Sequence, residues 1–397
     1  MKIEDAVKDR YAAASQEREV ALCCPVDYDA QYLKVIPTEV IERDYGCGDP
    51  SKYVKEGETV LDLGSGTGKI CFIASQVVGP TGKVIGVDMT DDMLGVAEEN
   101  APIVAERIGY SNVEFRKGRI QDLALDLRQF EAALAENPVT SAEGWMAAEN
   151  TAKELGTKTP MIPDNSIDVV VSNCVLNLVD TELKEQMFNE IFRVLKRGGR
   201  AVISDIVSDE EIPQHMVDDK RLWSGCISGA MTEKGFIKAF EDAGFYGISQ
   251  LKFESEPWQV VEGIEFRSVT IEAYKGKEGP CLDAKQAVIY KGPFKQVIDD
   301  DNHVIVRGER TAVCEKTFKI YSQAPYKVLF DFVEPREIVL PQDMKPFVCS
   351  TGVIQTTGGA AITQSQASPV RNPKDTKGSD YKVTTDPSQC DPASGCC

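Results

Sequence analysis

Cysteine is the residue type with the most chemical content in this sequence, which has twelve of them in 397 residues. Four stand in separate segments: Cys47 in "DYGCGDP", Cys71 in "GKICFIA", Cys174 in "VSNCVLNL" and Cys226 in "WSGCISG". Thiolates are soft ligands, suited to soft and thiophilic centres. Local sequence does not bring these four thiols together, so a shared site requires the fold to do so.

The redox state of the cellular compartment determines whether such cysteines are reduced thiols or form disulfides. The stretch "MKIEDAVKDR" carries acids early and has no apolar core of signal-peptide length, and no run of about 18 apolar residues could span a bilayer. We therefore expect a cytoplasmic protein with no membrane partner and mostly reduced cysteines. The formal net charge of −19 argues against nucleic-acid partners, because neutralising phosphates requires a basic face.

A bound metal cofactor is not expected. The two histidines, His215 and His303, lie far apart in the chain, which disfavours a His-based zinc site. The cysteines also lack the paired C-x-x-C knuckles typical of four-thiolate zinc sites. A second alternative to a thiol-binding site is that each of these cysteines has only a structural role, because a single buried cysteine usually packs as a small hydrophobic residue.

A glycine-rich turn is the second feature with chemical content. In "ETVLDLGSGTGKICFIA" the pattern predicts a short buried strand at Thr59–Leu63 and a helix from Lys69. The glycines between them allow a tight turn and a close approach to a ligand. They are Gly64, Gly66 and Gly68. The next predicted strand, "GKVIGVDM", ends near Asp88, where an acid can accept hydrogen bonds from both hydroxyls of a ribose.

This unit, with Asp62 before the turn and Asp88 after it, resembles the class I S-adenosylmethionine-dependent methyltransferases. The third strand and its loop in "NVEFRKGRIQDL" include Ile120–Asp122, where that family contacts adenine, and "SIDVVVSN" and "RVLKRGGRAVISDI" supply the fourth and fifth strands. The resemblance implies an α/β fold with a Rossmann-like, doubly wound sheet and S-adenosylmethionine as methyl donor. The cofactor-binding residues expected are Asp62, Gly64, Ser65, Gly66, Gly68, Asp88, Met89, Ile120, Gln121 and Asn173.

The cysteines sharpen the resemblance. The stretches "DYGCGDP", "LDLGSGTGKICFIASQVVG", "VSNCVLNLV" and "LWSGCISGA" closely resemble the arsenite methyltransferase family over about residues 22–275, and "RGERTAVCEKTF" is similar to members associated with arsenosugar formation. The resemblance implies that Cys47, Cys174 and Cys226 bind trivalent arsenic and that Cys71 joins Cys47 in thiol–disulfide exchange, which makes all four catalytic. It also implies arsenite or an arsenic–glutathione conjugate as substrate, and thioredoxin or glutathione as reductant.

The chemistry agrees with this assignment. Trivalent arsenic held by thiolates keeps a lone pair that can attack a sulfonium methyl group, so the reaction needs positioning rather than a general base. One alternative is a small-molecule C- or N-methyltransferase, which requires an acid or base beside the donor. Another is a thiol-rich metalloid-binding protein, which requires neither Asp88 nor the glycine turn. The number of methyl groups transferred and the preferred arsenic species stay open.

Four parts are expected along the chain: a helical segment with the Cys47 loop (1–56), the methyltransferase domain (57–275), a small β-rich domain (276–349) and a flexible, largely disordered tail (350–397). The β-rich assignment rests on alternating apolar and polar residues between Gly and Asp-Asn turns. The mostly helical insertion between Asp122 and Ser166 either caps the cofactor side of the sheet or is a structural embellishment.

The remaining cysteines have weaker assignments. The vicinal pairs Cys23–Cys24 and Cys396–Cys397 could capture arsenite or relay electrons from thioredoxin, and could equally be incidental. The others are attributed to structure or chance. They are Cys281, Cys314, Cys349 and Cys390.

Overall fold

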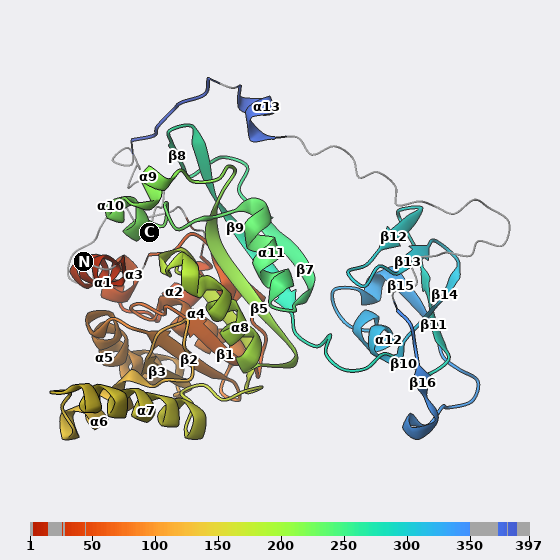
Figure 1. Cartoon of the computed structure of the whole chain (residues 1–397), viewed down its shortest axis with the longest axis horizontal. Helices are drawn as coiled ribbons and strands as arrows, with labels where there is room; N and C mark the ends of the chain where they lie inside the picture. The colour runs from red at the N-terminus through yellow and green to blue at the C-terminus, as the bar shows by residue number, and fades with distance from the viewer. Residues whose placement is uncertain are drawn as a thin grey trace. The chain divides into compact units, whose positions relative to one another are not determined.

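The computed structural model describes residues 3–14, 26, 28–43, 45–349, 372–378 and 380–386. The chain forms two compact units (Figure 1). Unit 1 comprises Met1–Lys275 with Pro373–Cys397, and unit 2 comprises Gly276–Asn372. The pairs Cys23–Cys24 and Cys396–Cys397 and the single Cys390 lie outside the described residues.

A nine-stranded sheet forms the centre of unit 1, and its main path runs β3-β2-β1-β4-β5-β9-β7. The neighbours from β3 to β5 are parallel, whereas β9 runs antiparallel to both β5 and β7. The strands are β1 (Thr59–Leu63), β2 (Lys83–Asp88), β3 (Val113–Lys117), β4 (Ile167–Asn173), β5 (Leu195–Ser208), β6 (Met231–Thr232), β7 (Tyr246–Phe253), β8 (Gln259–Val261) and β9 (Ile264–Tyr274). The predicted Rossmann-like sheet is confirmed.

Helices cover both faces of this sheet (Figure 1). Val60 and Val171 belong to a core with α4, and Leu61 and Leu63 belong to a second core with α8 and α11. Because both faces are covered, the central strands read as nearly continuous apolar runs. The helices of unit 1 are α1 (Ile3–Ala14), α2 (Ala30–Leu33), α3 (Thr38–Glu42), α4 (Lys69–Val78), α5 (Asp91–Ile108), α6 (Leu127–Glu136), α7 (Ala142–Lys158), α8 (Lys184–Val194), α9 (Gln214–Val217), α10 (Lys220–Ser224), α11 (Glu233–Asp242) and α13 (Pro373–Lys377), with 3₁₀ turns at Pro50–Tyr53, Leu176–Leu178 and Thr181–Leu183.

The insertion between β3 and β4 forms α6 and α7, which contact each other. Side chains start both helices: Asp126 accepts from the N–H of Gln129, and Ser141 accepts from the N–H of Gly144. Neither helix contains a buried residue, and Trp145 is exposed. Few apolar contacts therefore fix this pair of helices to the sheet. The contact between the pair and the edge of the sheet is polar.

Unit 2 is built from short antiparallel strands, as the alternating pattern predicts. Strand β11 lies between β14 and β15, β12 pairs with β13, and β10 pairs with β16. Aromatic rings fill its core, and the rings of Tyr321 and Phe330 stack with their centroids 4.6 Å apart. The elements are β10 (Leu282–Asp283), β11 (Gln286–Tyr290), β12 (Gln296–Ile298), β13 (Val304–Val306), β14 (Arg310–Val313), α12 (Glu315–Tyr321), β15 (Phe330–Val333) and β16 (Lys345–Pro346), with 3₁₀ turns at Lys327–Leu329 and Pro341–Asp343.

Part of the segment expected to be a flexible tail docks on unit 1. The Lys377 ammonium lies 2.6 Å from a carboxylate oxygen of Asp209 and 2.8 Å from one of Glu210. Further along, the N–H of Thr385 donates to the Val260 carbonyl in β8 at 2.7 Å. Lys377 thus lies between two acids, and Thr385 pairs with the backbone of β8. A disordered chain lacks such contacts.

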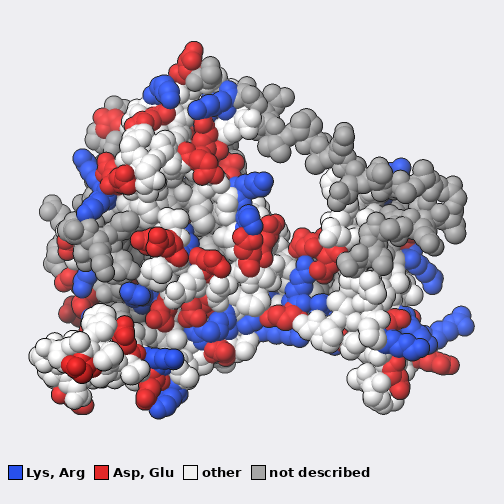
Figure 2. Space-filling model, viewed as in Figure 1, with Lys and Arg blue, Asp and Glu red and all other residues white. Residues whose placement is uncertain are grey.

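Charges of both signs are interspersed on the face of the molecule drawn in Figure 2. Figure 2 shows Lys and Arg side chains scattered among Asp and Glu on the face in view. Within the described part of the chain, no helix combines the length and the apolar character that a membrane span requires.

Candidate functional site

Cys174 follows β4 directly, at the edge where open α/β sheets bind ligands, and Cys226 follows α10. Both adopt left-handed backbone conformations, with φ of 63° and 62°. Such a conformation costs a non-glycine residue about 1–3 kcal/mol and persists where the surroundings fix it. Here the Cys174 N–H donates to the Ser204 carbonyl at 2.8 Å, and the Cys226 N–H donates to the Trp223 carbonyl at 3.0 Å. The two strained positions are therefore held by backbone bonds.

The loop that carries Cys47 is fastened to the end of the sheet. Asn173, the last residue of β4, accepts hydrogen bonds at its Oδ1 from the N–H groups of Cys47 and Gly48, at 2.9 and 3.0 Å. The Ser268 hydroxyl donates to the Cys47 carbonyl at 2.6 Å. A Cβ at Gly48 would meet Ser204 Cβ at 2.6 Å, so only glycine fits there. These contacts hold Cys47 beside Cys174.

We expect Asn173→Ala to release this loop. Two buried N–H groups lose their acceptor, at about 1–3 kcal/mol each, so the free energy of unfolding should fall by roughly 3 kcal/mol. Cys47, now 1% exposed, should also become reactive towards iodoacetamide. Asn173→Asp keeps the Oδ1 acceptor of both bonds and is the matched control. Denaturant unfolding and mass spectrometry of alkylated Cys47 check this, and equal protection of Cys47 in all three proteins would contradict it.

Cys47, Cys174 and Asp205 converge. Their two Sγ atoms and a carboxylate oxygen all lie within 4.8 Å of one another, and all three residues are buried. Cys226 stands outside this group but in the same apolar cluster, where its Sγ lies 3.3 Å from the Cys174 carbonyl oxygen and 3.9 Å from the Tyr11 hydroxyl. The structure thus brings two of the expected arsenic ligands into range of one ion and places the third beside them.

Asp205 is a buried acid with a buried base nearby. Burial raises the pKa of Asp205 to about 6, even though the N–H of Ile206 and the charge of Lys184 act to lower it. Burial likewise lowers the pKa of Lys184 to about 8, against the opposing charge of Asp205. Near neutral pH the carboxylate is therefore close enough to its pKa to accept and return a proton.

Cys71 has different surroundings. It lies on α4 in the core that contains Val60 and Val171, and its Sγ donates to Asp62 Oδ2 at 3.2 Å. Asp62, expected to contact the cofactor, thus interacts with a thiol in this structure. The exchange role of Cys71 stays a prediction.

One pocket of unit 1 joins the glycine turn to Cys174. Seven of the expected site residues line it: Gly64, Gly66, Asp88, Met89, Ile120, Gln121 and Cys174. The expected residues Asp62, Ser65, Gly68 and Asn173 are not among the described residues that line it, and neither α6 nor α7 contributes to its lining. Helix α1, through Val7 and Tyr11, contributes instead.

The pocket fits the cofactor expected from the sequence. Gly64 has φ 68°, and a Cβ there would meet Val175 Cγ1 at 2.4 Å, so the turn needs glycine. Asp88 accepts from the N–H of Gly66 at 2.9 Å and from that of Thr90 at 2.8 Å, which places an acceptor at the end of β2. Burial raises the pKa of Asp88, although both of these bonds lower it. A hydroxyl-bearing ligand satisfies such a half-buried acid well.

Comparison with known proteins settles the family. A model described as a methyltransferase domain matches residues 54–157 and 151–244. Over 337 residues the chain is 31% identical to the arsenite methyltransferase of Aquipseudomonas alcaligenes. The aligned region covers 80% of this chain and 86% of the relative. The chain belongs to the arsenite methyltransferase family. As a member of that family it is a methyltransferase, and the resemblance drawn from the motifs is confirmed.

Two further relatives agree with this family assignment. The human arsenite methyltransferase is 32% identical over 74% of this chain and 72% of its own length. The crystal structure of an arsenic(III) S-adenosylmethionine methyltransferase from Chlamydomonas reinhardtii has 27% identity and a TM-score of 0.52, covering 81% of this chain and 97% of that one. A model described as a domain of unknown function matches residues 277–381.

Sequence reasoning missed several residues that lie at the site. Asp205 stands in "AVISDIVS", where a charged residue interrupts a buried strand, and that interruption was the available signal. Tyr11 of α1 had no comparable signal. Burial and the nearby Cys226 and Cys174 raise its pKa well above the ordinary value, so its hydroxyl stays protonated beside Cys226. The other missed residues that line the pocket are Val7, Arg43, Tyr45, Thr90, Met93, Gly118, Val175, Leu178 and Val179.

Proposed function

We propose that this chain methylates trivalent arsenic held by the thiolates of Cys47, Cys174 and Cys226, with S-adenosylmethionine in the pocket of unit 1. One observation carries the proposal. The Cys174 Sγ lies within 4.8 Å of the Cys47 Sγ, and the same residue lines the pocket together with Gly64 and Asp88. A thiophilic substrate on these sulfurs is therefore beside the space that the donor takes.

Capture of arsenite is an exchange of ligands at arsenic. In each step a cysteine S–H bond and an As–O bond break, while an As–S bond and an O–H bond of water form. The proton thus travels from the thiol to the leaving hydroxide. Asp205, grouped with Cys47 and Cys174, is placed to accept that proton and return it. Cys226 completes the set once its Sγ turns from the Cys174 carbonyl.

Positioning is the main contribution of the protein to the transfer itself. When bound, S-adenosylmethionine supplies an electrophilic methyl group. Gly64 and Gly66 let the backbone approach it, and Asp88 accepts hydrogen bonds from its ribose hydroxyls. The buried side chains of Cys174 and Leu178 exclude water on the other side of the pocket. Holding two reactants in register in this way lowers a barrier by about 7–11 kcal/mol.

Asp88→Ala should weaken S-adenosylmethionine binding. The change removes a charge-assisted acceptor, a loss of about 1.5–3 kcal/mol, or roughly ten- to hundredfold in Kd. Because Asp88 also bonds to the N–H of Gly66, Asp88→Asn is the matched variant that keeps one acceptor oxygen in the turn. Calorimetric titration measures both, and unchanged affinity of the alanine variant contradicts the assignment.

Methyl transfer to the lone pair raises arsenic to the pentavalent state, and its return to the trivalent state takes two electrons, which a pair of cysteine thiols supplies by forming a disulfide. Turnover therefore needs that disulfide to be reduced. We propose that Cys71 exchanges with Cys47, with Asp62 accepting the Cys71 proton across the 3.2 Å hydrogen bond, and that thioredoxin or glutathione supplies the reducing equivalents. A reducing compartment such as the cytoplasm suits this requirement.

The deciding experiment is a product analysis. The reduced protein is incubated with arsenite, S-adenosylmethionine and glutathione or thioredoxin, and arsenic species are separated and identified by mass spectrometry. Methylated arsenic that depends on both the protein and the donor is the expected result. Bound but unmethylated arsenic would point to a metalloid-binding protein, and methylation of an added carbon or nitrogen nucleophile alone would point to another methyltransferase class.

A further inference from the structure

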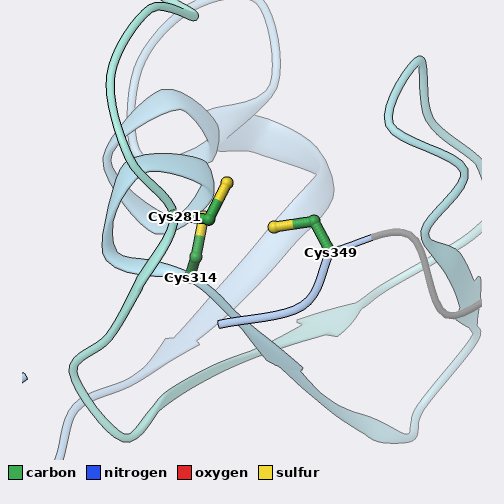
Figure 3. Close-up of side chains that lie close together, drawn as sticks. All are labelled: Cys281, Cys314 and Cys349. Carbon is green, nitrogen blue, oxygen red and sulfur yellow. The ribbon is translucent and has the colours of Figure 1, made fainter. Parts of the chain in front are cut away.

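A second cluster of thiols lies in unit 2, outside the site described above. The Sγ atoms of Cys281, Cys314 and Cys349 all lie within 4.8 Å of one another. Figure 3 shows the Cys349 sulfur pointing towards the other two. From the sequence alone, these cysteines are attributed to structure or chance.

The fold of unit 2 brings these three residues together from separate segments. Cys281 stands just before β10, and Cys349 stands shortly after β16, the strand that pairs with β10. The N–H of Phe347 donates to the Cys281 carbonyl at 2.9 Å, so the pairing continues to the cysteine itself. Cys314 joins β14 to α12 and is fully buried, whereas the other two cysteines are partly exposed. A ligand can therefore reach the cluster from the Cys281–Cys349 side.

The surroundings prepare the cluster to bind through sulfur. Burial raises the pKa of the Cys281 thiol, but hydrogen bonds from Cys349 and Cys314 and the charge of Lys316 outweigh it and hold that pKa below its ordinary value. Burial and hydrogen bonds with Cys281 and Cys314 raise the pKa of the Cys349 thiol. Of these two cysteines, Cys281 is thus the one that favours the thiolate. A thiolate is the form that attacks a thiophilic centre.

The geometry points to a second binding site for trivalent arsenic at Cys281, Cys314 and Cys349. Metal–thiolate bonds are about 2.3 Å long, so sulfurs on one centre lie about 3.7 Å apart, and sulfurs that already lie within 4.8 Å of one another need to contract by at most about 1 Å. Binding of arsenite breaks three As–O bonds and forms three As–S bonds, and each leaving hydroxide becomes water by taking a thiol proton or, at the Cys281 thiolate, a proton from solvent. No electrons are transferred, and no co-reactant is required.

Trivalent arsenic suits the site better than zinc. Structural zinc takes four ligands, and among the described residues no carboxylate, imidazole or further thiol joins the three sulfurs within 4.8 Å. Trivalent arsenic forms three bonds and keeps a lone pair, so three thiolates complete its coordination and leave a neutral complex. The Lys316 ammonium beside Cys281 also disfavours a dication there.

The test uses the full chain with Cys47, Cys174 and Cys226 changed to serine, which removes the methylation site. In this background the reduced protein is loaded with arsenite and desalted, and arsenic per chain is measured by elemental mass spectrometry. Adding Cys314→Ser should remove one equivalent of arsenic. Serine at 314 can still cap α12, where Cys314 Sγ now accepts from the N–H of Thr317 at 3.3 Å, so the fold should survive.

Two controls keep the result unambiguous. Cys390→Ser in the same background, at a cysteine other than these three, should leave the arsenic content unchanged. Cys349→Ser, at a partly exposed position, should lose the same equivalent as Cys314→Ser, and X-ray absorption of the background protein should show arsenic bound to three sulfurs. Equal arsenic content with and without Cys314 overturns the proposal. So does a zinc ion that arsenite does not displace, or a disulfide within the cluster that persists in the reduced protein.

Discussion

Cys174→Ser should abolish methylation of both arsenite and methylarsenite, with a fall in kcat of at least about a hundredfold. That is the loss which a 1 Å misplacement of reacting atoms can produce, and removing a ligand displaces the arsenic by more than that. A serine hydroxyl is a hard ligand and too weakly acidic to replace a thiolate. The position matters because Cys174 belongs both to the sulfur group and to the lining of the pocket.

A glycine variant separates the thiol from the backbone in this prediction. Cys174 has φ 63°, a conformation that glycine adopts without strain, so Cys174→Gly should fold at least as well as the serine variant. Both variants should bind S-adenosylmethionine with unchanged Kd and fail in catalysis. Wild-type turnover of either variant on both arsenic substrates would show that Cys174 is not a ligand.

The parts of the fold that follow local rules could be read from the sequence. The turn at Gly64–Gly68 lies between a strand and a helix at the predicted residues, because a positive φ at Gly64 leaves few alternatives. The path β3-β2-β1-β4-β5 follows from repeated βα units. The insertion of β9 between β5 and β7 depends on pairing between distant segments, which no local pattern determines.

The residues of the site also fall into those that local sequence indicates and those that only the fold brings together. Cys47, Cys174 and Cys226 lie in recognisable motifs, so the sequence indicates them as arsenic ligands. Asn173 was named for the cofactor, but its amide holds the Cys47 loop, a contact that depends on how two distant segments meet. The cluster at Cys281, Cys314 and Cys349 is a product of strand pairing alone, and residues that meet only in this way leave no signature in a single sequence.

Asp205→Asn should change how stability depends on pH. The folded pKa of about 6 lies above the ordinary value of 3.8, so between these values the folded chain holds a proton that the unfolded chain has released. Stability therefore falls as pH rises through this interval, by roughly 3 kcal/mol for the wild type. The asparagine variant lacks this proton. The difference in free energy of unfolding, variant minus wild type, should increase from pH 4 to pH 6, whatever constant offset the lost hydrogen bonds introduce.

The same substitution should slow arsenite capture. Proton transfer by a positioned side chain contributes about 10²–10⁴-fold, so kcat/KM for arsenite should fall by at least about a hundredfold in Asp205→Asn, and its inflection near pH 6 should disappear. Lys184→Met tests the cause, because the ammonium now lowers the pKa of Asp205 and its removal should move the inflection to higher pH. If Asp205 only shapes the sheet, its variant keeps the inflection and loses kcat and kcat/KM together. If Asp205 moves the proton to the leaving hydroxide, its variant loses kcat/KM for arsenite and keeps kcat. The reason is that only arsenite capture involves a proton, whereas the transfer of a methyl group to a lone pair does not.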